Sequence, residues 1–194
     1  MKKIIIEGAD CTGKTTFAKK LAGNDKTLFH YGIYRDVPVD KQFAFFRTSM
    51  DLPLSVVFDR CPLSEYIYSK YRGVKPWFTL NDIYKLIDQE YGECQIHFLI
   101  PNKKLIVKLC NLTDQPEFVR NNIVNIADDY TMLASHLTGK ENVSVLDTTK
   151  DLEKAIKQLE KQNDNNSGLR NSADPTTPRL STKTSRSRDQ REQQ

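Results

Sequence analysis

An eight-residue stretch near the N-terminus has the residue types and the spacing of a loop that binds phosphate groups. It reads Gly8-Ala9-Asp10-Cys11-Thr12-Gly13-Lys14-Thr15, which fits the pattern G-x-x-x-x-G-K-(S/T) of the P-loop. The glycines let backbone N–H groups turn toward phosphate oxygens, and the following helix contributes the positive end of its dipole. We therefore expect Gly8–Thr16 to bind the phosphates of a nucleoside triphosphate, with Lys14 on the β- and γ-phosphates and Thr15 on Mg²⁺.

The segments on either side of this loop favour the same interpretation. Lys2–Ile6 has the apolar pattern of a short buried strand, and Thr16–Ala22 has that of an amphipathic helix. A P-loop requires this order of strand, loop and helix, whereas a glycine-containing turn that fits the pattern by chance does not. We expect Lys14 to face solvent when no ligand is bound.

A second group of residues that could do chemistry follows the apolar segment Leu54–Phe58. Asp59 and Arg60 come directly after this segment, so a strand here would carry them to the same sheet edge as the P-loop. Asp59 could hold Mg²⁺ through a water molecule or accept a proton, and Arg60 could bind a phosphate. The alternative is structural, because Asp59 could instead cap a helix that begins after Pro62.

Apolar runs typical of strands alternate along the chain with helical patterns. The expected strands are Ile4–Ile6, Thr27–His30, Leu54–Phe58, Gln95–Ile100 and Asn142–Leu146. The expected helices beyond the first are Asp40–Met50, Leu63–Tyr71, Leu80–Glu90, Lys103–Cys110, Glu117–Leu137 and Leu152–Lys161. This alternation predicts an α/β fold in which helices cover both faces of a five-stranded parallel sheet. Ligands of such sheets bind at the carboxyl ends of the strands.

Composition limits the class of protein further. The chain has 194 residues, which suits one α/β domain, and a formal net charge of +4, which permits anionic ligands without requiring nucleic acid. We expect no membrane span, since no apolar run is long enough, and no leader before the first strand, and therefore a cytoplasmic protein. Neither the scattered cysteines nor the three distant histidines have the spacing of a zinc site, and we expect His30, His97 and His136 each to be structural.

The composition changes near Asn163. From there to Gln194 polar residues dominate, and Leu169 and Leu180 are the only large apolar side chains. Such a stretch buries too little surface to offset its conformational entropy. We expect a folded domain over residues 1–162 and a disordered, mildly basic tail over residues 163–194. The tail is solvated or makes at most a weak contact with nucleic acid or another partner.

Together the two motifs resemble those of thymidylate kinases. The run from Glu7 to Thr16 resembles the E-G-x-D-x-x-G-K-(S/T)-T loop of that family, and the run from Asp59 to Tyr66 resembles its D-R-Y-x-x-S-x-x-Y segment. The likeness is specific in these motifs and extends loosely over residues 2–161. It implies a three-layer P-loop NTPase domain with a short lid. It further implies a kinase that transfers the γ-phosphoryl group of ATP, with Mg²⁺, to a (deoxy)nucleoside 5′-monophosphate.

Other expectations follow from the family rather than from this chain's own patterns. The loop after the last strand approaches the adenine of ATP in this superfamily. Thymidylate kinases are commonly homodimers and serve nucleotide biosynthesis. The compact size and the lack of a targeting segment are compatible with a phage or bacterial origin.

The resemblance also implies roles for residues at the acceptor nucleotide. Asp10 would lie near its sugar and phosphate, and Arg60 would contact its phosphate. Phe43 and Arg47 fall where the family places an aromatic ring and an arginine against the acceptor base, although core packing explains Phe43 equally well. Tyr66 would shape the same pocket or belong to the core.

The chain departs from the family pattern in two places. The T-R-E-P-G segment after the second strand is absent, which leaves Arg35 as the candidate for binding the acceptor phosphate. Cys11 stands where some relatives have an arginine, so a cation from the lid, expected at Asn111–Val119, would have to take that role. The candidate cations are Arg72, Lys104, Lys108 and Arg120.

Three other functions stay open. A deoxynucleoside kinase shares the fold but phosphorylates a 5′-hydroxyl, for which Asp59 could be the base, although the corresponding segment begins Glu-Arg-Ser in those enzymes. A non-catalytic or switch-type nucleotide-binding protein such as a GTPase would carry N-K-x-D, but Asn102-Lys103-Lys104-Leu105 lacks the aspartate. A kinase of nucleic-acid ends would use the basic tail for recruitment.

Overall fold

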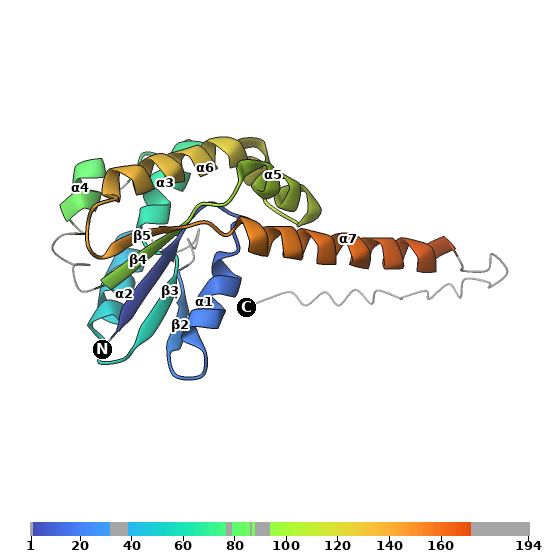
Figure 1. Cartoon of the computed structure of the whole chain (residues 1–194). Helices are drawn as coiled ribbons and strands as arrows, with labels where there is room; N and C mark the ends of the chain where they lie inside the picture. The colour runs from blue at the N-terminus through green and yellow to red at the C-terminus, as the bar shows by residue number, and fades with distance from the viewer. Residues whose placement is uncertain (1, 32–38, 77–78, 86, 88–93, 172–194) are drawn as a thin grey trace, which may run out of the picture. The chain divides into compact units, whose positions relative to one another are not determined.

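Strands and helices alternate along the chain, as the apolar pattern predicts (Figure 1). The computed structural model describes residues 2–31, 39–76, 79–85, 87 and 94–171. The strands are β1 (Lys3–Glu7), β2 (Thr27–His30), β3 (Val56–Asp59), β4 (Cys94–Leu99) and β5 (Val143–Leu146). The helices are α1 (Lys14–Ala22), α2 (Val39–Asp51), α3 (Leu63–Tyr71), α4 (Leu80–Lys85), α5 (Lys103–Leu112), α6 (Glu117–Leu137) and α7 (Thr149–Asn171).

The five strands form one parallel sheet in the order β2-β3-β1-β4-β5, which confirms the predicted fold class. β1 is central because its Ile-Ile-Ile run can be buried on both faces, and every residue of the strand is buried. The register aligns Asp59 of β3 with Ile6 of β1 on one side and with His30 of β2 on the other. Polar side chains from neighbouring strands therefore meet at the carboxyl edge of the sheet.

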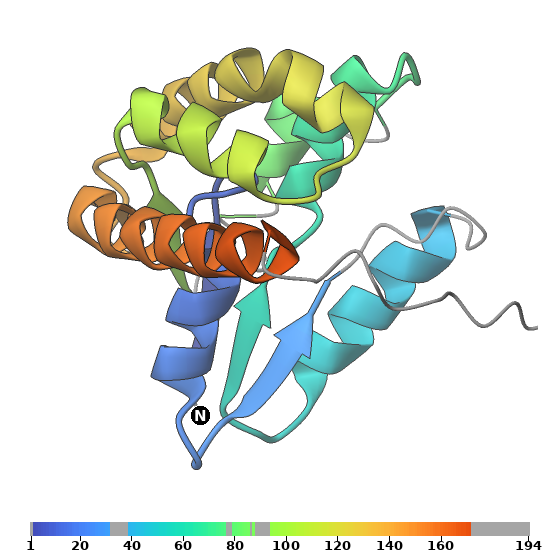
Figure 2. The same cartoon turned by 90° about the vertical axis from the view of Figure 1, so that its right-hand side faces the viewer.

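Alternate residues of β1 face two different layers of helix. Ile4 and Ile6 belong to a cluster with Ala18 of α1, which contacts β1, β2 and β3 (Figure 2). Ile5 faces the opposite way and joins a larger cluster to which α2, α3 and α6 contribute. This arrangement gives the three layers expected of the fold.

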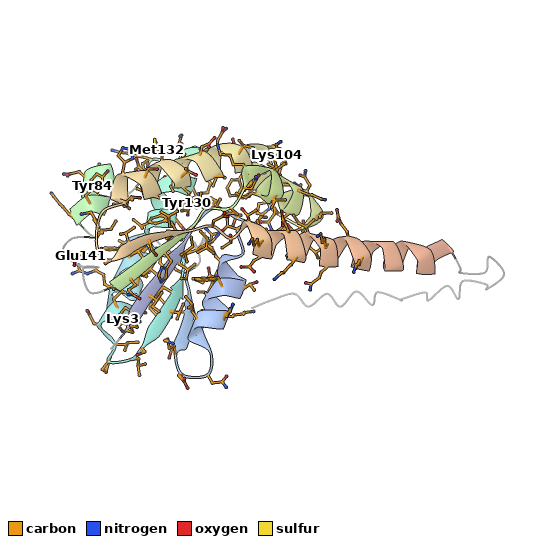
Figure 3. The ribbon with its side chains drawn as sticks, viewed as in Figure 1. Lys3, Tyr84, Lys104, Tyr130, Met132 and Glu141 are labelled. Carbon is orange, nitrogen blue, oxygen red and sulfur yellow. The ribbon has the colours of Figure 1, made fainter. Side chains whose placement is uncertain are left out.

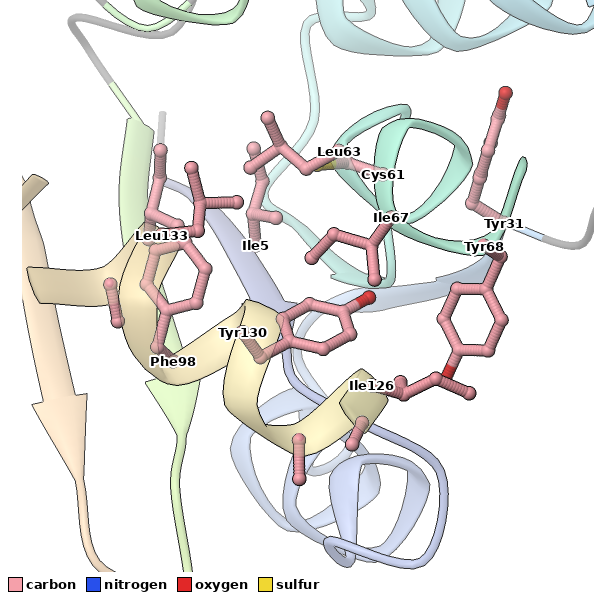
Figure 4. Close-up of a cluster of buried hydrophobic side chains, with 14 of the residues drawn as sticks. Ile5, Tyr31, Cys61, Leu63, Ile67, Tyr68, Phe98, Ile126, Tyr130 and Leu133 are labelled. Atoms are coloured by element: carbon pink, nitrogen blue, oxygen red, sulfur yellow. The ribbon is translucent and has the colours of Figure 1, made fainter. Parts of the chain in front are cut away.

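Helix α6 shows how one apolar stripe anchors the second layer. Tyr130 points from α6 into the interior and is fully buried, whereas Met132 lies on the outer side and is 56% exposed (Figure 3). Around Tyr130 the packed side chains come from three elements that are distant in sequence, with Ile67 from α3, Phe98 from β4 and Leu133 from α6 (Figure 4). This layer holds the carboxyl ends of β1 and β3 in fixed positions.

Most elements differ from the sequence prediction by one or two residues at an end, and three of the differences bear on the site or on the domain boundary. β3 ends at Asp59 rather than Phe58, because Asp59 still pairs with both neighbouring strands. α4 is described only over Leu80–Lys85, and most of the remainder predicted to reach Glu90 lies outside the described residues. α7 continues to Asn171, past the predicted domain boundary, and residues 172–194 lie outside the described part.

The contacts within the chain divide it into Met1–Leu159, which contains the sheet, and Glu160–Gln194. The sheet-containing unit carries all the candidate site residues described below. No helix of the described residues combines the length and the apolarity that crossing a membrane requires.

Candidate active site

Two glycines give the loop after β1 its shape. Gly8 has φ 148°, and a Cβ on it would lie 2.7 Å from the carbonyl oxygen of Leu99, so no larger residue fits there. Gly13 has φ 83° and immediately precedes α1. Cys11 is also left-handed, at φ 61°, although it has a side chain. Strain of this kind in a non-glycine residue is typical of functional loops, because the surrounding structure must hold it in place.

Lys14 does not face solvent as the sequence led us to expect. Its side chain folds back over the loop, its ammonium donates a hydrogen bond to the carbonyl oxygen of Ala9, and it is 5% exposed. Burial, together with the positive charge of Arg60, lowers the pKa of Lys14 to about 8. The expectation was wrong because the loop curls tightly enough to supply a carbonyl acceptor within reach of its own lysine.

Asp59 lies directly beside the first turn of α1. The Thr15 hydroxyl donates a 2.6 Å hydrogen bond to Oδ2 of Asp59, and the same oxygen lies 3.0 Å from Nδ1 of His30. Asp59 does not cap α3, whose first turn receives no side-chain cap. Oδ1 of Asp59 is buried and has no hydrogen-bond partner among the described residues. An unpartnered carboxylate oxygen next to a hydroxyl is a donor set that suits Mg²⁺.

Arg60 and Asp10 form an ion pair across the P-loop. The Tyr68 hydroxyl donates to Oδ2 of Asp10 at 2.9 Å, and the Arg60 guanidinium lies over the Tyr68 ring at 5.2 Å. Burial acts to raise the pKa of Asp10, but the charges of Arg60 and Lys14 outweigh it and hold this pKa below its usual value. The pair therefore presents an ionised carboxylate and a guanidinium side by side.

A buried network fixes the backbone on which Arg60 lies. Glu7 is fully buried and accepts hydrogen bonds from the Cys61 backbone at 2.7 Å, from Ser64 at 2.9 Å and from Tyr130 at 3.1 Å. Arg60 itself has φ 78°, a conformation that a non-glycine residue adopts only under constraint. The Glu7 network supplies that constraint, because it holds the backbone of the next residue, Cys61.

These groups surround two adjoining cavities. A cavity of about 380 Å³ over the P-loop is lined by both Lys14 and Arg60, and also by Asp10, Thr15 and His30. A second cavity of about 360 Å³ shares Gly13 and Thr16 with the first and extends to Thr148 and Leu152 at the start of α7. The Thr148 hydroxyl donates to the backbone oxygen of Thr12, so the loop after β5 lies against the P-loop.

The structure brings only some of the predicted acceptor residues to this cavity. Asp10 and Arg60 line it. Tyr66 instead lines a separate cavity between α3 and α6, with Lys70 and Asp129. Phe43 packs against the core, and the guanidinium of Arg47 lies 5.9 Å from its ring. Arg35 lies outside the described residues.

The predicted lid, Asn111–Val119, covers the end of α5, a four-residue connection and the start of α6, and two residues of the connection, Thr113 and Gln115, line the P-loop cavity. Burial raises the pKa of Cys110 on α5, while Cys11 and the nearby charge of Arg120 act against that rise. Arg120 is exposed in the first turn of α6 and is not among the residues that line the P-loop cavity, whereas Lys104 lines a separate cavity together with Ala9 and Thr12 of the P-loop. Lys104 and Lys108 are exposed on α5. Arg72 is at the end of α3, in an ion pair with Glu65.

Sequence reasoning missed several residues of the site. Tyr68, two positions after the predicted Tyr66, is the tyrosine that contacts Asp10. His30 was interpreted as structural, although its position at the end of an expected strand was a signal that it could reach Asp59. Nothing in the sequence pointed to the role of Tyr130, because its hydrogen bond to Glu7 joins residues 123 positions apart. Asn102 proved to cap α5 by accepting from the Lys104 backbone, which is a structural role.

The fold resembles those of two solved structures, one of which is a nucleotide kinase. YorR from Bacillus subtilis, solved in complex with phosphorylated GDP, matches with a TM-score of 0.61 and 18% identity over 86% of this chain and 98% of that chain. Thymidylate kinase from Candida albicans matches with a TM-score of 0.51 and 16% identity over 86% of this chain and 92% of that chain. No protein-family model and no curated protein sequence matches this chain. The likeness shows that this chain shares the α/β fold of these two proteins.

Proposed function

We propose that this protein is a kinase that transfers the γ-phosphoryl group of ATP to a (deoxy)nucleoside 5′-monophosphate. The observation that carries the proposal is that Lys14 and Arg60 line one cavity, each paired with a different partner group. A phosphoryl-transfer site needs cations on both the donor and the acceptor side of the transferred group. A protein that only binds a nucleotide does not need the cation on the acceptor side.

The P-loop residues would act on the donor. Lys14 exchanges its bond to Ala9 for the β- and γ-phosphates, and the backbone N–H groups of the loop bind the remaining phosphate oxygens. The adjoining cavity by Thr148 and Leu152 takes the adenosine of ATP. In this arrangement the γ-phosphate of ATP would lie on the side of Lys14 where Arg60 lines the cavity.

Asp10, Arg60 and Tyr68 would act on the acceptor. Arg60 binds the acceptor phosphate, and Asp10, kept ionised, accepts from a sugar hydroxyl while it also orients the guanidinium. Thr113 and Gln115 of the lid cover the cavity and exclude the water that would otherwise hydrolyse ATP. In-line transfer then needs no covalent intermediate on the protein.

Mg²⁺ fits the oxygens at the edge of this cavity. Thr15 and Asp59 would hold the ion, Asp59 through a water molecule, because its Oδ1 is unpartnered among the described residues. Bound there, Mg²⁺ neutralises negative charge on the phosphates.

One observation favours a second candidate, a deoxynucleoside kinase. Asp10 neutralises Arg60 in the ligand-free protein, which leaves less positive charge for an anionic acceptor. A nucleoside would accept the phosphoryl group on its 5′-hydroxyl, with Asp59 or Asp10 as the base.

The exchange of Lys14 for methionine tests the kinase assignment. Methionine preserves the buried volume, so we expect a folded protein whose kcat with ATP falls by a hundredfold or more, about the loss found when one group that stabilises the transition state is removed. Lys19→Met is the matched control, because Lys19 is exposed on the same helix and should keep wild-type kcat. Wild-type turnover by Lys14→Met would contradict the assignment.

A further inference from the structure

We propose that His30 is a positioning residue that orients the Asp59 carboxylate. The inference rests on the proposed function, which gives Asp59 its place at Mg²⁺. It begins with the sheet register, in which His30 of β2 is the direct partner of Asp59 of β3. Side chains at paired positions of adjacent parallel strands project to the same face, less than about 5 Å apart. The contact is thus a consequence of the fold and not of a flexible loop.

The hydrogen bonds define what His30 does there. Asp59 Oδ2 is the acceptor, so Nδ1 of His30 must carry the hydrogen in their 3.0 Å contact. Thr15 donates to the same oxygen from α1, on the other side. Two donors from different elements therefore hold Oδ2, and Oδ1 stays without a partner among the described residues. The carboxylate cannot rotate without breaking one of these bonds.

Exposure separates His30 from an ordinary core histidine. The His30 side chain is 58% exposed and lines the P-loop cavity, whereas that of Asp59 is 2% exposed. A histidine that only filled the core would be buried. A histidine that only contributed to solubility would not direct its Nδ1 toward a buried carboxylate. Outer hydrogen bonds of this kind commonly change metal affinity or activity by about 10- to 100-fold when they are removed.

Two substitutions at position 30 distinguish positioning from simple packing. His30→Ala removes the donor, whereas in His30→Asn the side-chain amide can still donate from close to the position of Nδ1. We expect kcat to fall by about tenfold or more in His30→Ala and by less than about threefold in His30→Asn, with KM for ATP little changed in both. His136→Ala is the matched control, because Nδ1 of His136 also donates a local hydrogen bond, to the backbone carbonyl oxygen of Met132, on the exposed side of α6.

Binding of Mn²⁺ in the presence of a non-hydrolysable ATP analogue gives a readout that needs no turnover. Followed by electron paramagnetic resonance, Mn²⁺ affinity should fall in His30→Ala and recover in His30→Asn, with all variants still folded at the assay temperature. Unchanged kcat and Mn²⁺ affinity in His30→Ala would overturn the proposal, as would equal losses in His30→Asn. If no acceptor is phosphorylated at all, the proposed function fails, while Mn²⁺ affinity still decides the role of His30.

Discussion

At the scale of single residues, the buried ammonium of Lys14 is the feature with the largest energetic consequence. A charge in the interior costs free energy unless it is well paired, and Lys14 has a neutral carbonyl as its partner. The nearby carboxylates of Asp10 and Asp59 offset part of that cost, but its pKa still falls to about 8. The ligand-free loop is therefore less stable than an apolar loop of the same shape, and bound phosphates would remove the deficit.

We predict that Lys14→Met is more stable than the wild type when no ligand is bound. A fall in pKa from 10.5 to about 8 corresponds to a cost of about 3 kcal/mol at neutral pH, so a gain of about 1–3 kcal/mol is expected. Between pH 8 and pH 10.5 the unfolded wild-type chain keeps a proton that the folded chain has released. Rising pH therefore stabilises the wild type and reduces the difference in unfolding free energy between Lys14→Met and the wild type. Urea unfolding of both proteins at pH 7 and pH 9.5 measures this difference in unfolding free energy. A difference that grows with pH would contradict the account.

The residues of the site differ in how far the sequence could predict them. The glycines, Lys14 and Thr15 follow a local pattern whose physical basis lies within one loop. Asp59 followed from its place after an apolar run. The choice of Tyr68 over Tyr66 could not be made in advance, because it depends on the rotation of α3 about its own axis, which packing against α6 determines.

At the scale of elements, one hydrogen-bond network joins β1, α3 and α6. Glu7 at the end of β1 accepts from Ser64 on α3 and from Tyr130 on α6, and Tyr130 also lies 2.9 Å from the Ser64 hydroxyl. Because Glu7 immediately precedes Gly8, the network ties the helical layer to the start of the P-loop. A buried carboxylate is tolerated there only while all three donors are in place.

We predict that Tyr130→Phe loses about 1–3 kcal/mol of stability, since the ring volume is kept while a buried carboxylate loses a donor. Chemical denaturation followed by circular dichroism measures the change. Tyr71→Phe is the control: its hydroxyl also donates to a carboxylate, Asp129 at 2.6 Å, but Tyr71 is only partly buried, so its loss should be smaller. An equal loss of stability in the two variants would contradict the account, because it would show that burial of Glu7 does not increase the contribution of its hydrogen bond with Tyr130.

At the scale of the whole molecule, hydrophobic periodicity was sufficient to predict the sheet and most helices. Strand-to-helix alternation constrains a parallel sheet strongly, because each crossover has one favoured hand. The extension of α7 to Asn171 was not predictable from that pattern, since polar residues there carry no apolar stripe. The joint position of Lys14 and Arg60 on one cavity likewise emerges only from the complete fold.

The most direct test of the central claim is a screen of acceptors with the purified protein, ATP and Mg²⁺. Each ribo- and deoxynucleoside monophosphate, and each parent nucleoside, is incubated separately, and the products are identified by mass. We predict a nucleoside diphosphate together with one ADP per transfer from at least one monophosphate, with no product from its parent nucleoside. Phosphorylation of nucleosides alone, or hydrolysis of ATP with no phosphorylated acceptor, would contradict the account.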